Sequence, residues 1–328
     1  MKGFTIAGIP IPSPFVLGPM AGFTDYSLRQ MSSSYGAGLV YTEMESCESL
    51  VYKSKATKED CLSTALDRKN EKDTKLALQI FGGKPDFVLQ SIPLFENFAQ
   101  YDFLDFNCGC PVPKVLKQGA GSKWLTRLDE LLPLLKEMVA LSKKPVIVKL
   151  RTGFDKEIDM VSLAKEIEKA GVSAIAIHGR TRNQFFAGPV DYALIRAVKE
   201  AVSIPVIANG GITEKNFQEV EEETKADGLM VAQRAIGYPK VFEDMTRISE
   251  GEDPLPSSLS RQLDDLEKHL KLIFSFKEER KAADIMKGIS THYIRGFDKA
   301  AKIRSSLVQC KTLEEYETLI EECRKELQ

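Results

Sequence analysis

Eight short apolar runs divide the first 232 residues of this chain, and each is followed by an interval long enough for a helix. The runs are residues 15–20, 38–43, 76–81, 103–109, 145–150, 173–179, 205–211 and 227–232. Their apolar residues are continuous rather than alternating, which is typical of parallel strands buried on both faces. Eight such repeats are the number that closes a (β/α)8 TIM barrel, so this α/β fold is the one we expect. The pattern alone leaves an open doubly wound sheet as the alternative.

Polar or reactive residues lie at the carboxyl ends of these runs. They are Pro19, Met20, Glu43, Gln79, Asn107, Cys110, Lys149, His178, Asn209, Gly210 and Gly211. In a barrel these ends meet at one mouth, where the active sites of such folds are found. We therefore expect a single site.

The composition changes after Gly237, where Gly251, Pro254 and Pro256 indicate a linker. Apolar residues then return at helical spacing in 263–274 and 313–323, the second behind a capping box that pairs Thr312 with Glu315. We predict a catalytic barrel domain over residues 1–252 and a small helical-bundle domain over 253–328.

The composition excludes several classes of protein. A hydrophobic content of 43% and a formal net charge of −2 describe an ordinary globular protein. The chain has no 18-residue apolar run, and its first 20 residues lack the pattern of a signal peptide. The six cysteines have neither the density of a disulfide framework nor the C-x-x-C spacing of a zinc site. We expect a cytoplasmic protein with no membrane segment and no metal.

The charge is unevenly distributed in the C-terminal part. Residues 261–311 hold 12 Lys and Arg against 7 Asp and Glu, whereas residues 314–328 hold 2 against 6. Such a basic segment indicates either a surface for nucleic acid or a solvated helix face.

Residues 105–111 read Asp-Phe-Asn-Cys-Gly-Cys-Pro, and this passage resembles the active-site motif of the dihydrouridine synthase family. Further segments resemble the same family in the same order, namely residues 18–25, 78–83, 148–154, 177–195, 205–212 and 287–307. The resemblance spans nearly the whole chain. It implies a barrel enzyme that uses FMN to reduce the C5=C6 bond of uridines in tRNA, with NADPH or NADH as the reductant.

The resemblance implies that Cys110, immediately before the proline, donates a proton to the substrate. The chemistry is consistent, because a thiol with an ordinary pKa of about 8.5 is mostly protonated at neutral pH. We assign Cys108 to packing.

The resemblance also implies a set of cofactor-binding residues. They are Pro19, Met20, Ala21, Gln79, Lys149, His178, Asn209, Gly210, Gly211, Ala232 and Gln233. Lys149 matches a family lysine near flavin N1 and O2, although a lone lysine on a strand could also form an ion pair in the core. His178 could likewise be a hydrogen-bonded core residue. The sequence departs from the family after the eighth run, where Ala232-Gln233-Arg234 stands in place of the usual Gly-Arg or Ala-Arg followed by a small residue.

The expected substrate-binding residues lie in both predicted domains. They are Asn107, Arg151, Arg180, Arg182, Lys287, Arg295, Lys299, Lys302 and Arg304. We expect the last five to contact tRNA phosphates. Three other functions remain open on the residues alone: a flavin barrel acting on a free pyrimidine, a non-catalytic RNA-binding protein, and a phosphosugar-processing barrel.

Overall fold

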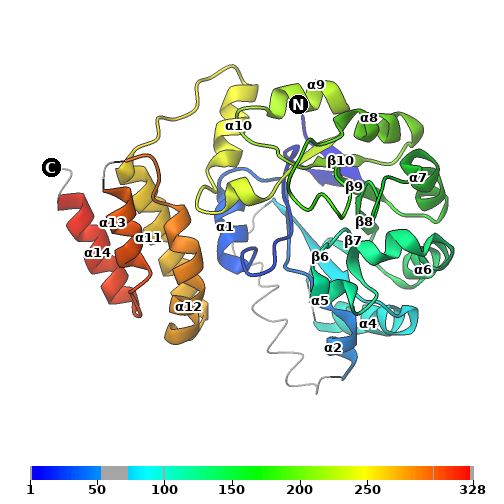
Figure 1. Ribbon diagram of the computed structural model, residues 1–328, viewed down its shortest axis with the longest axis horizontal. Helices are drawn as coiled ribbons and strands as arrows, with labels where there is room; N and C mark the ends of the chain where they lie inside the picture. Colours follow the sequence, from blue (N-terminus) through cyan, green and yellow to red (C-terminus); the bar gives the residue numbers. More distant parts are fainter. Residues whose placement is uncertain (1, 53–72, 99, 298, 326–328) are drawn as a thin grey trace.

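The computed structural model describes residues 2–52, 73–98, 100–297 and 299–325, and its centre is a closed parallel barrel (Figure 1). Its eight strands are β3 (Phe15–Leu17), β4 (Leu39–Tyr41), β6 (Lys75–Phe81), β7 (Phe103–Cys108), β8 (Val146–Arg151), β9 (Ala174–His178), β10 (Val206–Asn209) and β11 (Gly228–Val231). Each strand pairs with the next, and β11 pairs with β3 to close the ring. A two-residue strand, β5 (Glu45–Ser46), also pairs with β6. The predicted fold class is confirmed.

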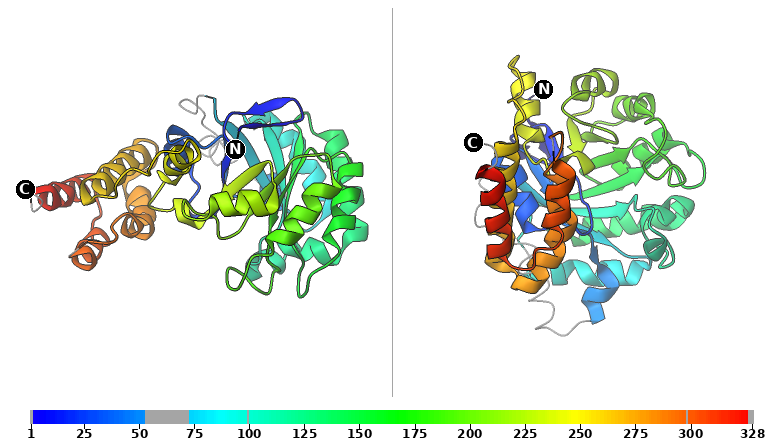
Figure 2. Two further views of the ribbon diagram at one scale, coloured as in Figure 1. Left: turned by 90° about the horizontal axis from the view of Figure 1, so that it is seen from above. Right: turned by 60° about the vertical axis from the view of Figure 1, so that its left-hand side comes forward.

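Helices surround the barrel between successive strands (Figures 1 and 2). They are α1 (Tyr26–Ser34), α2 (Cys47–Tyr52), α4 (Pro85–Phe98), α6 (Leu128–Leu141), α7 (Met160–Lys169), α8 (Tyr192–Ala201), α9 (Phe217–Thr224) and α10 (Val241–Ser249). Shorter turns lie in the loops: α5 (Pro113–Leu116), η1 (Gly121–Thr126) and η2 (Gln233–Ala235). No helix in the described ranges is long and apolar enough to cross a membrane.

An N-terminal hairpin, which the sequence did not reveal, belongs to the barrel core. It consists of β1 (Phe4–Ile6) and β2 (Ile9–Ile11) in antiparallel register. Ile6 and Ile11 are fully buried and pack with the inward-facing residues of the barrel strands. The strands are only three residues long and one contains Pro10, so local propensity gave no strand signal.

The C-terminal part is a helical bundle of α11 (Leu259–Phe276), α12 (Glu279–Ile289), η3 (Ser290–His292), α13 (Ala300–Leu307) and α14 (Leu313–Lys325). The bundle has its own hydrophobic cluster and projects from the barrel beside α1 and α10 (Figure 2). Half of the predicted capping box is present. The Glu315 N–H donates to Thr312 Oγ1 at 3.2 Å, but the Glu315 carboxylate accepts from the N–H of Lys311.

Polar and aromatic contacts attach the bundle to the barrel. Tyr35 of α1 donates a hydrogen bond to the Asp265 carboxylate of α11, and Lys240 lies 3.4 Å from the same carboxylate. The rings of Phe23 and His292 meet edge to face at 6.3 Å. Since these contacts join residues far apart in the sequence, they fix the bundle against one side of the barrel.

We predict that Gly237→Ala destabilises the protein more than Gly251→Ala. Both glycines have positive φ, +68° and +84°, so alanine strains either by about 1 kcal/mol or more. An added Cβ at position 237 would lie 2.3 Å from the backbone carbon of His292, whereas at 251 it meets nothing within 4 Å. We expect Gly251→Ala to lower Tm by about 2–4 °C and Gly237→Ala by at least twice as much. Equal shifts in thermal unfolding would contradict the close approach.

Candidate active site

The structure brings five of the predicted site residues together at the mouth of the barrel. These residues, at the ends of β6 to β10, are Gln79, Asn107, Lys149, His178 and Asn209. The strand register aligns them, because Asn107 pairs with Lys149 and His178 pairs with Asn209. Parallel pairing thus brings residues that are 42 and 31 positions apart in the chain side by side.

A chain of hydrogen bonds runs from a buried carboxylate to the cysteine loop. Gln79 Nε2 donates to Asp105 Oδ2 at 2.6 Å, and Asn107 Nδ2 donates to Gln79 Oε1 at 2.8 Å. Asn107 Oδ1 then accepts from the N–H groups of Gly109 and Cys110 at 3.1 and 2.9 Å. The position of Cys110 therefore depends on the two amides below it.

Asp105 is part of the cysteine motif but was assigned no role of its own from the sequence. Its carboxylate is fully buried on β7, and desolvation raises its pKa above the ordinary value, while Gln79 and Lys149 oppose that shift. The signal was present in the motif, because Asp105 and Asn107 alternate on one strand and so face the same side.

Lys149 projects into this polar cluster from β8. Its Nζ donates to Asn209 Oδ1 at 3.0 Å, and Asn209 Nδ2 donates to the carbonyl of Met230 at 2.9 Å. Desolvation lowers the pKa of Lys149, as does the positive charge of Arg151, whereas Asp105 raises it. The hydrogen-bond partner is a neutral amide, so a close core ion pair does not describe this lysine.

Cys110 follows β7 and is partly exposed. Its carbonyl accepts from both the N–H and the hydroxyl of Ser122 at 3.0 Å, which fixes the loop from a second side. Burial raises the pKa of the thiol, and the charges of Arg151 and Lys149 only partly offset that effect. The thiol is therefore protonated at neutral pH. Cys108, by contrast, is fully buried among apolar residues, which agrees with packing.

His178 and Arg151 are both buried at the mouth. Desolvation, followed by the charges of Arg151, Lys149 and Arg180, holds the pKa of His178 far below its usual value, so the ring is neutral. Its Nε2 lies 3.3 Å from Arg180 Nη1, which makes it the acceptor. Arg151 donates to the carbonyls of Gly109, Thr181 and Phe185 at 2.8–2.9 Å. This side chain connects two loops of the mouth.

The loop after β3 contains the other predicted cofactor residues on this side. Pro19 and Met20 are half-buried and Ala21 is exposed. The backbone N–H and the carbonyl of Met20 both bond the hydroxyl of Thr24, so the loop is closed on itself. Gly22, which follows Ala21, donates its N–H to Glu43 Oε1 at 3.0 Å.

The loops after β10 and β11 present backbone donors. None of the described residues accepts a hydrogen bond from the N–H of Gly210, Gly211 or Gln233. Gly210 and Gly211 have φ of +124° and +64°. Ala232 is half-buried between these donors and β11. Such N–H groups form a cradle that suits an anion.

Arg234 occupies the position where the sequence departs from the family. Its Nε and Nη2 donate to the Glu214 carboxylate at 2.7 and 2.6 Å, and its guanidinium lies 4.2 Å from the ring centroid of Tyr238. Gln233 is exposed. The arginine is thus paired within the protein.

Of the other predicted substrate-binding residues, Arg180 reaches this cluster through His178, and the rest lie outside it. Arg180 and Arg182 are on the loop after β9, and Arg182 donates to Asn183 Oδ1 at 2.7 Å. Five lie on the bundle: Lys287, Arg295, Lys299, Lys302 and Arg304. Lys287 is paired with Asp284, and Arg304 donates to the carbonyl of Ile294. Desolvation and the nearby charges of Arg234 and Arg304 lower the pKa of Arg295. Arg295 therefore lies near both Arg304 of the bundle and Arg234 of the barrel.

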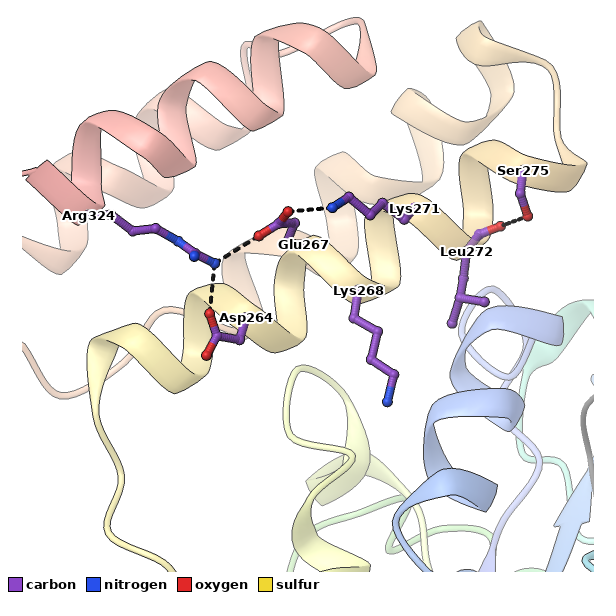
Figure 3. Close-up of a pocket in the computed structure, with 7 residues that line it drawn as sticks. All are labelled: Asp264, Glu267, Lys268, Lys271, Leu272, Ser275 and Arg324. Atoms are coloured by element: carbon purple, nitrogen blue, oxygen red, sulfur yellow. Dashed lines mark hydrogen bonds and ion pairs between the residues drawn. The ribbon is translucent and has the colours of Figure 1, made fainter.

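A cavity of about 600 Å³ lies on the bundle, away from the strand ends. Figure 3 shows its lining: Asp264, Glu267, Lys268, Lys271, Leu272, Ser275 and Arg324. Arg324 pairs with Asp264 and Glu267, and Lys271 also pairs with Glu267. These four charged groups pair with one another, and Lys268 donates to Ser34 Oγ at 3.2 Å. No cluster of metal-binding side chains occurs among the described residues.

The sequence profile of the family described as dihydrouridine synthase (Dus) matches residues 16–328. The chain belongs to this family. A probable tRNA-dihydrouridine synthase from Rickettsia bellii is 32% identical over 307 residues, covering 92% of each protein. A tRNA-dihydrouridine synthase B from Vibrio cholerae is 32% identical over 314 residues, covering 94% of this chain and 95% of the relative. The resemblance drawn from the motifs is confirmed.

Comparison with solved structures supports the fold. Morphinone reductase in complex with tetrahydroNAD superposes with a TM-score of 0.56 at 11% identity, covering 79% of this chain and 92% of that one. At this identity the likeness concerns the barrel architecture alone.

We predict that alkylation of Cys110 by iodoacetamide has a pH midpoint above the ordinary thiol value of about 8.5. Burial disfavours the thiolate, so the pKa is raised. Lys149→Met should move the midpoint higher still, because a cation that stabilises the thiolate is removed. Peptide mass mapping separates Cys110 from the other cysteines. A midpoint below 8.5, or a downward shift in Lys149→Met, is the opposite result.

Proposed function

We propose that this protein is a tRNA-dihydrouridine synthase that reduces the C5=C6 bond of uridines with FMN as its cofactor and NADPH or NADH as the reductant. The observation that carries the proposal is the Cys110 loop, which Asn107 and Ser122 hold at the same barrel mouth as Lys149. The names of the relatives, which are tRNA-dihydrouridine synthases, support the same substrate.

The polar residues of the mouth fit a flavin. Lys149 would stabilise negative charge on the pyrimidine part of the ring, and Gln79 would hydrogen-bond that edge with its remaining donor and acceptor. Pro19, Met20 and Ala21 would lie against the ring system, and neutral His178 would contact it without adding charge. When bound, FMN supplies the hydride that is added to C6 of the uracil ring.

Backbone groups would hold the phosphate of the cofactor. The N–H groups of Gly210, Gly211, Ala232 and Gln233 suit that role, and Asn209 supports the first two from β10. Arg234 is already paired with Glu214, so it is not free to replace the missing family arginine. The Gln233 departure is then compatible with cofactor binding.

Cys110 would supply the proton that completes the reduction at C5. The thiol hydrogen leaves as a proton, and its bonding electrons stay on sulfur. The resulting thiolate then takes a proton from solvent. The charges of Lys149 and Arg151 stabilise that thiolate. Asn107 holds the backbone of Cys110, and we assign it a contact with the uracil ring. Hydride and proton together account for the two hydrogens gained by the base.

The substrate uridine must leave its stack before it can enter the mouth, so contacts to the surrounding RNA are required. We assign phosphate contacts to Arg180 and Arg182 at the mouth. On the bundle we assign them to Lys287, Arg295, Lys299, Lys302 and Arg304. Repulsion among Arg295, Arg234 and Arg304 is what a bound phosphate would relieve. We thus propose residues 1–252 as the catalytic domain and 253–328 as the tRNA-binding domain, working in the cytoplasm where tRNA is found.

We predict that Cys110→Ala abolishes nearly all dihydrouridine formation while retaining flavin and reductant oxidation by oxygen, because only the proton donor is lost. The measurement is mass mapping of dihydrouridine in tRNA from a strain that lacks the gene, complemented with either form. If wild-type protein restores no dihydrouridine, the proposed function is wrong. If Cys110→Ala restores it fully, another group donates the proton.

We also predict that Gln233→Ala leaves FMN affinity within a few-fold of wild type, because backbone groups bind the phosphate. Gly211→Val should lose much of the flavin, since φ at this position is +64° and a side chain would crowd the anion. Flavin titration of both variants provides the measurement. A large loss with Gln233→Ala and a small loss with Gly211→Val would mean that side chains hold the phosphate.

A further inference from the structure

The loop between β9 and α8 exposes two adjacent aromatic side chains. Phe185 is 40% exposed and Phe186 is 55% exposed. The other large apolar side chains exposed in the described ranges, Tyr52, Val112 and Leu141, are isolated from one another in sequence. A paired aromatic surface at the rim of an active site is typical of an interaction site.

The backbone of this loop is held in an unusual conformation. Phe185 has a φ of +49°, a left-handed value that bulky residues rarely adopt. The Phe185 carbonyl accepts from buried Arg151 at 2.8 Å, and its N–H donates to the Arg182 carbonyl at 3.1 Å. Strain of this kind persists where surrounding contacts determine it, and it is concentrated at functional sites. Since Arg151 also binds Gly109, the backbone of Phe185 is fixed relative to the cysteine loop.

Several cations lie against the aromatic rings of this loop and of Phe154. The ring of Phe186 lies 6.2 Å from that of His178 at an interplanar angle of 31°, and the Arg151 guanidinium lies 5.5 Å from it. Arg182 lies 5.7 Å from the ring of Phe185 and 4.9 Å from that of Phe154. The same Phe154 ring has Lys123 Nζ at 5.0 Å.

We propose that Phe185 and Phe186 form a stacking platform for the nucleotides that flank the target uridine. The proposal rests on the function proposed above. When the uridine leaves its stack, its neighbours lose a stacking partner, and an aromatic ring can replace that partner. Arg182 and Lys123 then face the backbone phosphates of the same strand, because cations interleaved with aromatic faces match the alternation of bases and phosphates. Phe186 lies beside His178 at the mouth, so the platform would contact the RNA strand where that strand enters the mouth.

The test uses the flavin-loaded protein and a tRNA transcript that the wild type modifies. Phe186→Ala should raise Kd and KM for this tRNA about tenfold, with a smaller change in kcat, and should retain bound flavin. Phe186→Tyr should bind like wild type, because it keeps the ring. Leu141→Ala is the matched control, since it removes an exposed apolar side chain at the end of α6 and should change nothing.

A second substrate identifies the contact. In this transcript the bases on either side of the modified uridine are removed and the backbone is kept. Wild-type protein should bind it about tenfold more weakly, whereas Phe186→Ala should lose little further affinity, because the partner of the ring is already absent.

The possible outcomes separate the two proposals. Wild-type protein that forms no dihydrouridine contradicts the proposed function itself. If the wild type is active and neither Phe186→Ala nor Phe185→Ala changes the affinity for tRNA, only the stacking platform is wrong. Loss of flavin from Phe186→Ala and Phe186→Tyr would make the loop a cover of the cofactor instead. If the losses of affinity from Phe186→Ala and from removing the flanking bases simply add, the rings do not stack on those bases.

Discussion

Burial of the Asp105 carboxylate inside the barrel is the constraint on which the site depends. A buried carboxylate needs hydrogen-bond donors, and Gln79 Nε2 supplies one at 2.6 Å. That bond fixes the direction of the Gln79 amide, so its oxygen must accept from Asn107. The Asn107 oxygen in turn faces the backbone of Cys110. The placement of the reactive thiol is therefore set by a charge that lies deeper in the barrel and does not contact it.

The positive charges near Asp105 influence the pKa values of His178 and Cys110 at the mouth. Lys149, Arg151 and Arg180 surround His178, and together with burial they keep its ring neutral. The first two also limit how far burial raises the pKa of Cys110. Asp105 offsets the charge of Lys149, whereas Arg151 and Arg180 add further positive charge, so the mouth favours ligands that bring negative charge. This preference suits both a phosphate-bearing cofactor and a nucleic-acid substrate.

The barrel and the polar strand ends were predictable from the sequence, because parallel strands buried on both faces must be continuous apolar runs. The orientation of Gln79 was not, since it depends on Asp105 on the next strand. The contact of Tyr35 with Asp265 spans 230 positions, and no local pattern reports it. Nor does the sequence reveal the positive φ of Phe185, which depends on a guanidinium from another strand. Periodicity records which residues are buried, whereas these features depend on which buried residues meet.

The departure at Ala232-Gln233-Arg234 follows from the same reasoning about neighbours. Arg234 lies one position beyond the family arginine, and there it pairs with Glu214 and stacks on Tyr238. Its charge also acts on Arg295 of the bundle. Arg234 thus acts at the junction between barrel and bundle rather than at the backbone donors of the mouth. Because Gly237, a few residues later, packs directly on His292, one short loop connects the backbone donors at the mouth with the bundle.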